Sequence, residues 1–307
     1  MSQRSPRIAA AILRAAFDPS AQFGAEPGAE LEALISAFCA DEDADWVFEA
    51  GKKTARLRYV RQQVDKLIGG FEERRIIPPL RASGNSATYY RFVVIPAPGD
   101  DADAVGRRAR YRLHQAMLDS LRALDDGDFE YLCEAILREV GCTTTYVTRG
   151  SQDYGVDFFG RMPVAATALD DQTPTPPVGR VLGGLTMMLF GQAKRYGEAN
   201  TIDDGPLKEL ESTWADLVRG SIDRDLHPNL ETGLKSVGWK SADPVFFVFA
   251  TTSSYTRRAI SYARRAGMAT LDGDQIAQLL LEVAFGVEQQ GGAWVTSGDR
   301  IVAATRN

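Results

Sequence analysis

The second half of the chain alternates strand-like and helical segments, and this alternation constrains the fold more than any other feature. Apolar runs typical of strands lie at 143–147, 156–159, 185–194, 245–250 and 268–271. Apolar residues with helical spacing lie at 126–140, 206–219, 255–266 and 274–285. Strands alternating with helices predict an α/β domain in which helices flank a mixed sheet.

The first 115 residues have a different pattern, which is mainly helical. Helical spacing is found at 7–17, 29–39 and 51–71, and two β-prone runs, 76–80 and 89–95, then enclose a turn-rich stretch at 81–88. A helix followed by a basic hairpin is the outline of a winged-helix domain, in which a helix enters a groove of DNA. We therefore predict an N-terminal domain, 1–115, for DNA recognition and a second domain, 116–307. A proline- and acid-rich linker at 96–103 and one helix at 105–124 connect them.

Charge is distributed unevenly along the chain. The formal net charge of the 307 residues is −6, but 52–112 holds 14 Lys and Arg against six acidic residues, a local charge of +8. Such an excess favours a phosphate-binding face, and the alternative is a set of arginines that only solvate helix surfaces. No run approaches the roughly 18 apolar residues of a membrane helix, and no signal-peptide pattern is complete. We expect a cytoplasmic protein without a membrane partner.

Cysteine and histidine, the usual ligands of zinc sites, are scarce in this chain. Cys39, Cys133 and Cys142 are widely separated, no C-x-x-C is present, and the histidines are His114 and His227. Neither a structural zinc site nor a disulfide framework is expected.

Four polar residues lie where the pattern predicts burial. Asp157 shares a strand face with Phe159, Gln192 and Lys194 lie two apart on one strand, and Glu130 borders the apolar stripe of a helix. Carboxylates that hold a divalent metal, together with a lysine, suit phosphodiester hydrolysis. The alternative is an Asp157–Lys194 ion pair that only fixes the sheet.

These residues belong to an ordered series of motifs. The series consists of Asp-Phe-Glu at 128–130, Gly141, Gly-Ser-Gln-Asp-Tyr-Gly-Val-Asp at 150–157, Gln-Ala-Lys-Arg-Tyr at 192–196, and the segments 249–255 and 271–277. It resembles the Mrr-like restriction endonucleases, a Q-x-K branch of the PD-(D/E)xK nuclease superfamily, over residues 125–282.

The resemblance implies a restriction-endonuclease-like fold and a catalytic set of Glu130, Asp157, Gln192 and Lys194. Asp157 would be the central metal ligand, Gln192 would take the place of the second acid, Glu130 would support the metal, and Lys194 would be the catalytic lysine. The implied cofactor is Mg²⁺, with Mn²⁺ as a substitute. Asp153 is assigned to turn geometry.

Two departures from the family pattern concern the same region. Tyr154 stands where glycine is common, and 37 positions separate Asp157 from Lys194 because of a proline-rich insert at 163–180. Neither departure removes a catalytic group.

The resulting hypothesis is a Mg²⁺-dependent endonuclease that cleaves double-stranded DNA in restriction of foreign or modified DNA, an anti-phage role. A homodimer is expected by analogy, since cutting both strands takes two active sites, and partner proteins of a defence system would supply any nucleotide-driven step. Two alternatives stay open: a catalytically silent nuclease-fold binding or adaptor module, and a nuclease effector triggered by a ligand or partner.

Overall fold

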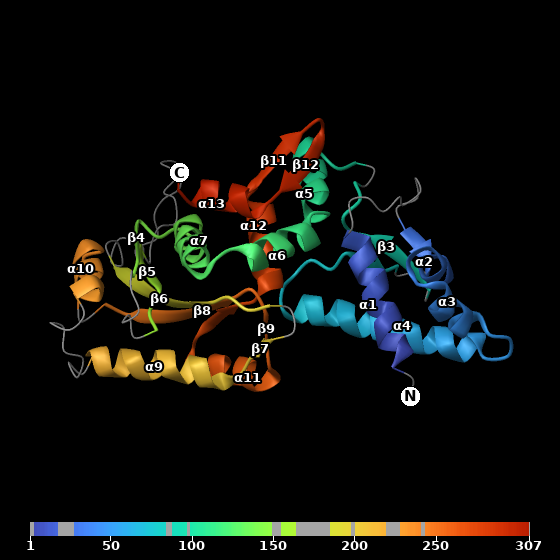
Figure 1. Ribbon diagram of the computed structural model, residues 1–307, viewed down its shortest axis with the longest axis horizontal. Coiled ribbons are helices and arrows are strands. Elements are labelled where there is room, and N and C mark those ends of the chain that lie inside the picture. Colours follow the sequence, from blue (N-terminus) through green and yellow to red (C-terminus); the bar gives the residue numbers. More distant parts are fainter. Residues whose placement is uncertain are drawn as a thin grey trace, which may run out of the picture. The chain divides into compact units, whose positions relative to one another are not determined.

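The computed structural model describes residues 3–17, 28–83, 88–96, 99–148, 155–163, 185–197, 200–218, 228–240 and 243–306. The chain forms two compact units (Figure 1). Unit 1 comprises 1–120 and 274–301, and unit 2 comprises 121–273 and 302–307. The functional division between 1–115 and 116–307 stays a prediction.

Unit 1 begins with four helices and a small antiparallel sheet. The helices are α1 (Arg4–Phe17), α2 (Leu31–Phe38), α3 (Asp41–Phe48) and α4 (Lys53–Glu73), and the strands are β1 (Gly28–Glu30), β2 (Leu80–Ala82) and β3 (Tyr89–Phe92). The strand order is β1-β3-β2, with β3 antiparallel to both neighbours. The order of these elements is a helix, a strand, further helices and a strand pair, and the winged-helix interpretation of this part stays a prediction.

Helical spacing explains the core of this part. Val60, Val64 and Ile68 lie on one face of α4 and are buried together with Ile8 and Ile12 of α1. Because residues four apart stack on the same side of a helix, these two apolar stripes pack against each other.

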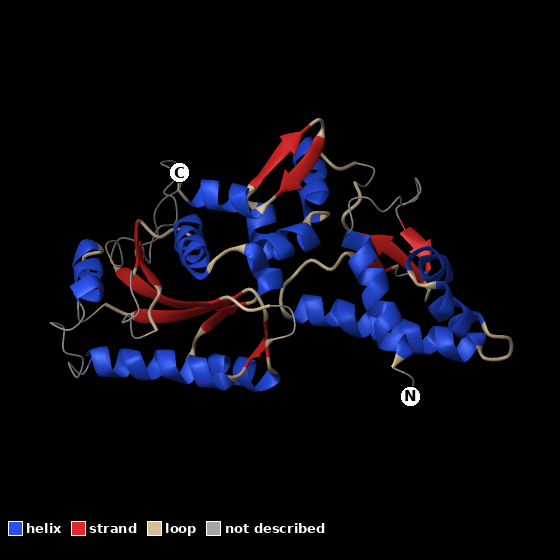
Figure 2. Cartoon of the chain, viewed as in Figure 1, coloured by secondary structure: helices blue, strands red, loops and turns tan. Residues whose placement is uncertain are grey.

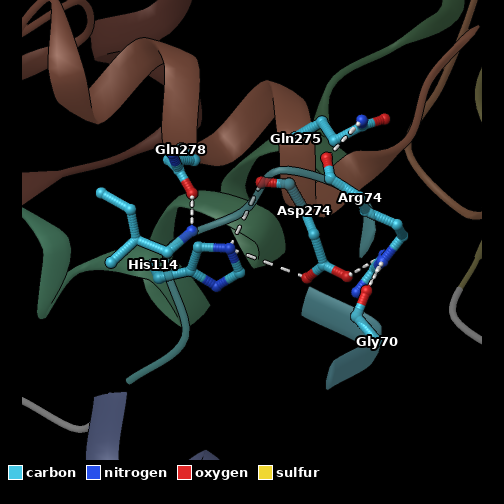
Figure 3. Close-up of polar contacts among 7 residues, drawn as sticks. Gly70, Arg74, His114, Asp274, Gln275 and Gln278 are labelled. Carbon is cyan, nitrogen blue, oxygen red and sulfur yellow. Dashed lines mark hydrogen bonds and ion pairs between the residues drawn. The ribbon is translucent and has the colours of Figure 1, made fainter. Parts of the chain in front are cut away.

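Later segments of the chain complete unit 1. They include α5 (Ala102–Tyr111), the hairpin β11 (Val287–Gln290) and β12 (Ala293–Thr296), and parts of α6 (His114–Ala123), α12 (Gly273–Glu282) and α13 (Gly298–Thr305). A polar cluster joins the end of α4 to the first turn of α12 (Figure 3). In it, Arg74 pairs with Asp274 at 2.8 Å, and the Ile77 N–H donates to Gln278 at 2.5 Å. Buried His114 lies 3.3 Å from the Asp274 carbonyl oxygen and stacks on Phe17.

Unit 2 is built on a five-stranded mixed sheet of order β10-β8-β6-β5-β4 (Figure 2). Its strands are β4 (Thr144–Val147), β5 (Phe158–Pro163), β6 (Thr186–Lys194), β8 (Val245–Thr251) and β10 (Ala269–Leu271). The β4–β5 and β5–β6 pairs are antiparallel, whereas β6–β8 and β8–β10 are parallel. A second pair, β7 (Thr201–Ile202) with β9 (Ser254–Tyr255), is parallel. The predicted mixed α/β fold is confirmed.

Helices pack on both faces of this sheet (Figure 1). They are α7 (Asp126–Glu139), α9 (Asp204–Val218), α10 (Pro228–Ser236) and α11 (Arg257–Ala266). Phe159, Phe190 and Phe249 come from three adjacent strands and are fully buried in one cluster with apolar residues of α9, α10 and α11. The Phe159 and Phe190 rings stack with centroids 5.4 Å apart.

The structure differs from the expected elements in several places. The helix expected at 105–124 is interrupted, because α5 ends at Tyr111 and α6 begins at His114. The cap of α7 is Asp125, whose carboxylate accepts from the Asp128 N–H at 2.6 Å, rather than Asp126 or Asp128. The short elements α3, α10, α13, β7, β9 and the β11–β12 hairpin were not expected. Within the described residues, no helix is both long and apolar enough to cross a membrane.

Candidate active site

Asp157 lies directly before β5 and is held by the backbone of the neighbouring strand. Its N–H donates to the Gly191 carbonyl at 2.9 Å, although Phe158 is the residue opposite Gly191 in the register. Two residues therefore face one, which is the arrangement of a β-bulge and a common way to redirect a side chain beside an active site. The prediction that Asp157 shares a strand face with Phe159 assumed that side chains alternate strictly along the strand. The bulge interrupts this alternation.

The carboxylate of Asp157 is anchored on β6. Its Oδ2 accepts from the Ala193 N–H at 2.6 Å, and the side chain is only 5% exposed. Ala193 lies between Gln192 and Lys194, so this bond brings the carboxylate to the part of β6 that carries both. The structure thus brings Asp157 to the part of β6 that holds Gln192 and Lys194, which follow it by 35 and 37 positions in the sequence.

Gln192 is the most informative residue of the site. The side chain is 1% exposed, and its Oε1 is a buried oxygen that has no hydrogen-bond partner among the residues that the structure describes. A buried polar atom without a partner costs about 1–3 kcal/mol, so such atoms require an explanation. An amide oxygen next to a carboxylate is a suitable ligand for a hard divalent cation.

Gly155 determines where the Gln192 amide can lie. The residue has a φ of +72°, and a β-carbon there would be 2.6 Å from Gln192 Nε2. Glycine is therefore required at this position for two reasons, the left-handed backbone conformation and the close approach of the Gln192 amide. The glycine belongs to the motif at 150–157, but sequence reasoning gave it no role.

Helix α7 contributes Glu130 from its second turn. Cys133, which lies three residues further along, is fully buried, and burial raises the pKa of its thiol well above the usual range. The negative charges of Asp157 and Glu130 raise it further, in that order. Both carboxylates are therefore close enough to Cys133 to act on the same thiol.

Lys194 ends β6, and its side chain leaves the same face of the strand as Gln192 because the two residues are two apart. The Thr251 hydroxyl of β8 donates to the Lys194 carbonyl at 2.7 Å and fixes the strand end. Arg195 then binds Asp126 at 2.8 Å and the Arg122 carbonyl at 3.3 Å. This link, which the sequence did not indicate, joins the end of β6 to the start of α7.

The arrangement fits a divalent metal through a mixed set of oxygen ligands. Among the described residues, no group of three or more His, Cys, Asp or Glu side chains could hold a metal ion. Among the predicted site residues, the candidate oxygen ligands are the amide of Gln192 and the carboxylates of Asp157 and Glu130. Asp153, Tyr154, His227 and all of the predicted insert at 163–180 except Pro163 lie outside the described residues.

The restriction endonuclease family model Mrr_cat matches residues 121–220. Over this segment the chain is similar to the restriction endonuclease family. The match includes all four residues of the predicted catalytic set, and it confirms the resemblance of the sequence motifs. No curated protein matches the chain in sequence.

Three solved structures are similar to this chain at low identity. MspJI restriction endonuclease in complex with a 27-mer oligonucleotide is 18% identical over 82% of this chain and 43% of that chain, with a TM-score of 0.39. The DNA modification-dependent restriction endonuclease AspBHI is 15% identical over 83% and 73%, with a TM-score of 0.38. FokI bound to DNA is 12% identical over 91% and 45%, with a TM-score of 0.35. This chain therefore spans less than half the length of two of the three, and no residue role is transferred from any of them.

Proposed function

We propose that this chain is a Mg²⁺-dependent endonuclease that hydrolyses phosphodiester bonds of double-stranded DNA. The observation that carries the proposal is the unpartnered Oε1 of buried Gln192 on the strand that also anchors Asp157 and presents Lys194. A structural role would leave the amide oxygen paired, because burial of an unpaired oxygen is costly. A metal ligand needs that oxygen free.

The roles of the residues follow from their positions. Asp157, Gln192 and Glu130 would hold Mg²⁺, which supplies a polarised phosphate and a bound water of lowered pKa. Ala193 N–H keeps the Asp157 carboxylate on β6, beside Gln192 and Lys194. Lys194 would orient the attacking water and offset negative charge that develops on the phosphate. Mn²⁺, which prefers similar oxygen ligands, would replace Mg²⁺.

We assign DNA recognition to the N-terminal domain, 1–115, and cleavage to 116–307. Several cations of the N-terminal domain form ion pairs within it, including Lys53 with Glu32 and Arg56 with Glu49. These paired cations contribute less to a phosphate-binding face than unpaired ones would. Exposed polar side chains remain along α4, namely Arg58, Gln62 and Lys66. Arginine and glutamine are side chains that read base edges, and lysine contacts phosphate. Helix α4 is thus our candidate recognition helix.

Cleavage of both strands would require two copies of the site, so a homodimer is part of the proposal. A role in restriction of foreign or modified DNA would place the protein in the cytoplasm, together with any partner proteins of a defence system.

The test is cleavage of supercoiled plasmid, methylated and unmethylated, by the full chain with Mg²⁺, Mn²⁺ or EDTA. Asp157→Asn and Lys194→Ala should abolish cleavage while DNA binding persists, because neither residue lies in the recognition domain. Lys235→Ala, which removes an exposed lysine of α10, is the matched control and should cleave normally.

Cleavage by both active-site variants would refute the assignment of these residues. DNA binding without cleavage by the native chain under every condition would favour the silent binding or adaptor module. A salt series separates DNA binding from other roles of the N-terminal domain, since affinity for DNA falls steeply with salt.

A further inference from the structure

A cavity of about 710 Å³ opens in unit 1 beside α4, outside the nuclease site. Trp46 of α3 and Arg56, Tyr59 and Gln63 of α4 line it, together with the first residues of α1. Its volume lies within the range of roughly 300–1,000 Å³ that small-molecule sites occupy. The cavity is thus far larger than a single ion or water requires.

The aromatic wall of this cavity is held in place. The Arg56 guanidinium lies over the Trp46 ring, 4.6 Å from its centroid, and also donates to the Trp46 carbonyl oxygen. Glu49 fixes the same guanidinium through an ion pair at 2.6 Å. An indole with a fixed orientation loses little freedom when a ligand stacks on it, which favours binding.

The second ring of the cavity, Tyr59, is a large apolar side chain left 36% exposed on α4. Gln63 follows one helical turn later and offers an amide that can both donate and accept. Aromatic faces combined with an amide suit a flat heterocycle that has hydrogen-bonding groups at its edge.

The charge of the cavity argues against an acidic peptide as the ligand. Its two cations, Lys52 and Arg56, share the carboxylate of Glu49 at 2.5 and 2.6 Å, so their positive charge is largely compensated. A ligand that binds mainly through stacking and edge hydrogen bonds fits this lining better than a chain of carboxylates.

We propose that this cavity, which we call the α4 cavity, binds a nucleobase. Tyr59 and Gln63 lie next to Arg58 and Gln62 on α4, the helix we assign to DNA recognition, and to that extent the inference rests on the proposed function. A base can come from two sources, an extruded nucleotide of the bound duplex or a free nucleotide. Either occupant would make cleavage depend on the chemical form of a base.

The test uses the full chain without Mg²⁺, so that its outcome does not depend on cleavage. In one arm, AMP, GMP, CMP and TMP are titrated while tryptophan fluorescence is recorded. In the other arm, the protein is added to duplex DNA that holds one 2-aminopurine, whose emission changes when the base leaves the DNA stack and enters the cavity. Trp46→Phe keeps an aromatic ring and should remove the tryptophan signal with little loss of affinity.

A matched pair of variants locates the response in the cavity. Ala55→Phe fills the cavity, because Ala55 lines it, whereas Thr54→Phe adds the same ring at an exposed helix position outside the lining. Ala55→Phe should weaken base binding by roughly 5- to 150-fold, the effect of one lost stacking contact. Thr54→Phe should bind normally, and equal unfolding midpoints would show that both variants fold.

A response of the first arm that Ala55→Phe abolishes identifies a free nucleotide as the ligand. A response of the second arm alone identifies an extruded base. No response in either arm, or an equal response of the two phenylalanine variants, overturns the proposal. The nuclease assignment would survive that result, since it is tested separately by Lys194→Ala.

Discussion

Replacement of Gly155 by alanine should reduce cleavage far more than it reduces stability. The φ of +72° alone costs an alanine about 1–2 kcal/mol. The new β-carbon would also lie 2.6 Å from Gln192 Nε2, closer than non-bonded atoms approach, so the amide must move. Because Gln192 is a proposed metal ligand, a shift of its oxygen should lower activity by roughly 10- to 100-fold, as loss of a supporting contact does at metal sites.

Gly267→Ala provides a control for the backbone cost. Gly267 ends α11 with a φ of +70°, and a β-carbon there would meet nothing within 4 Å. Both variants should therefore lower the unfolding midpoint by a few degrees, at roughly 2–4 °C per kcal/mol. The difference in cleavage between the two variants then isolates the effect of displacing Gln192.

The assay is the initial rate of plasmid nicking as a function of Mg²⁺ concentration, with unfolding midpoints measured in parallel. The Gly155→Ala variant should need more Mg²⁺ for half-maximal rate, whereas Gly267→Ala should follow the native curve. Identical Mg²⁺ curves for the two variants would show that the position of the Gln192 amide does not matter, and the reasoning would fail.

Three further predictions concern packing, thiols and charge. Phe159→Ala should lower the free energy of unfolding by about 3–5 kcal/mol, because the ring is fully buried, while Phe246→Ala, at a side chain 48% exposed, should have a much smaller effect in the same denaturant titration. Cys133 and Cys142 should resist alkylation at pH 8 and react after unfolding, since burial raises the pKa of the Cys133 thiol well above the usual range and that of Cys142 to about 11, and the thiolate is the reactive form. A hydrogen bond from Lys208, with further support from Arg258, lowers the pKa of Asp204. Its stabilising effect is therefore present at neutral pH and is lost as the pH falls through that lowered pKa, so the stability gap between the native chain and Asp204→Asn should close in acid.

Local patterns predicted most of the secondary structure of unit 2 because each pattern acts within a few residues. The apolar runs became β6 and β8, and the helical spacing after Asp125 became α7. The break between α5 and α6 was missed because the apolar spacing continues through it. The cap of α7 was misplaced because Asp125, Asp126 and Asp128 are chemically equivalent, and only the backbone geometry selects Asp125.

The sequence predicted which residues form the candidate site, but it did not predict their geometry. Period two puts Gln192 and Lys194 on one face of a strand, and the motif order connects them with Asp157. The bulge at Asp157, the bond from Ala193 and the approach of Gln192 to Gly155 depend on how β5 and β6 pair, and pairing between distant segments has no local signature. The α4 cavity was missed for a similar reason, because Trp46 and Tyr59 converge only when α3 packs beside α4.

An amide rather than a carboxylate at position 192 has its own consequence for metal binding. Asp157 already places a carboxylate on β6 next to position 192, and a second carboxylate there would repel it in the absence of a cation. Gln192→Glu should therefore have a lower unfolding midpoint than the native chain in EDTA. Mg²⁺ should raise the midpoint of this variant more than that of the native chain, because the cation offsets the added charge.

The pH dependence of Gln192→Glu should have a definite sign. Protonation of the added carboxylate removes the repulsion, so the variant should recover stability in EDTA as the pH is lowered from 8 to 5. The native chain has no carboxylate at position 192 and lacks this contribution. Gln289→Glu, an exposed substitution on β11, adds the same charge away from the site and is the control. Equal effects of Mg²⁺ on both variants would mean that position 192 does not face a cation, and the metal site would have to be sought elsewhere in the chain.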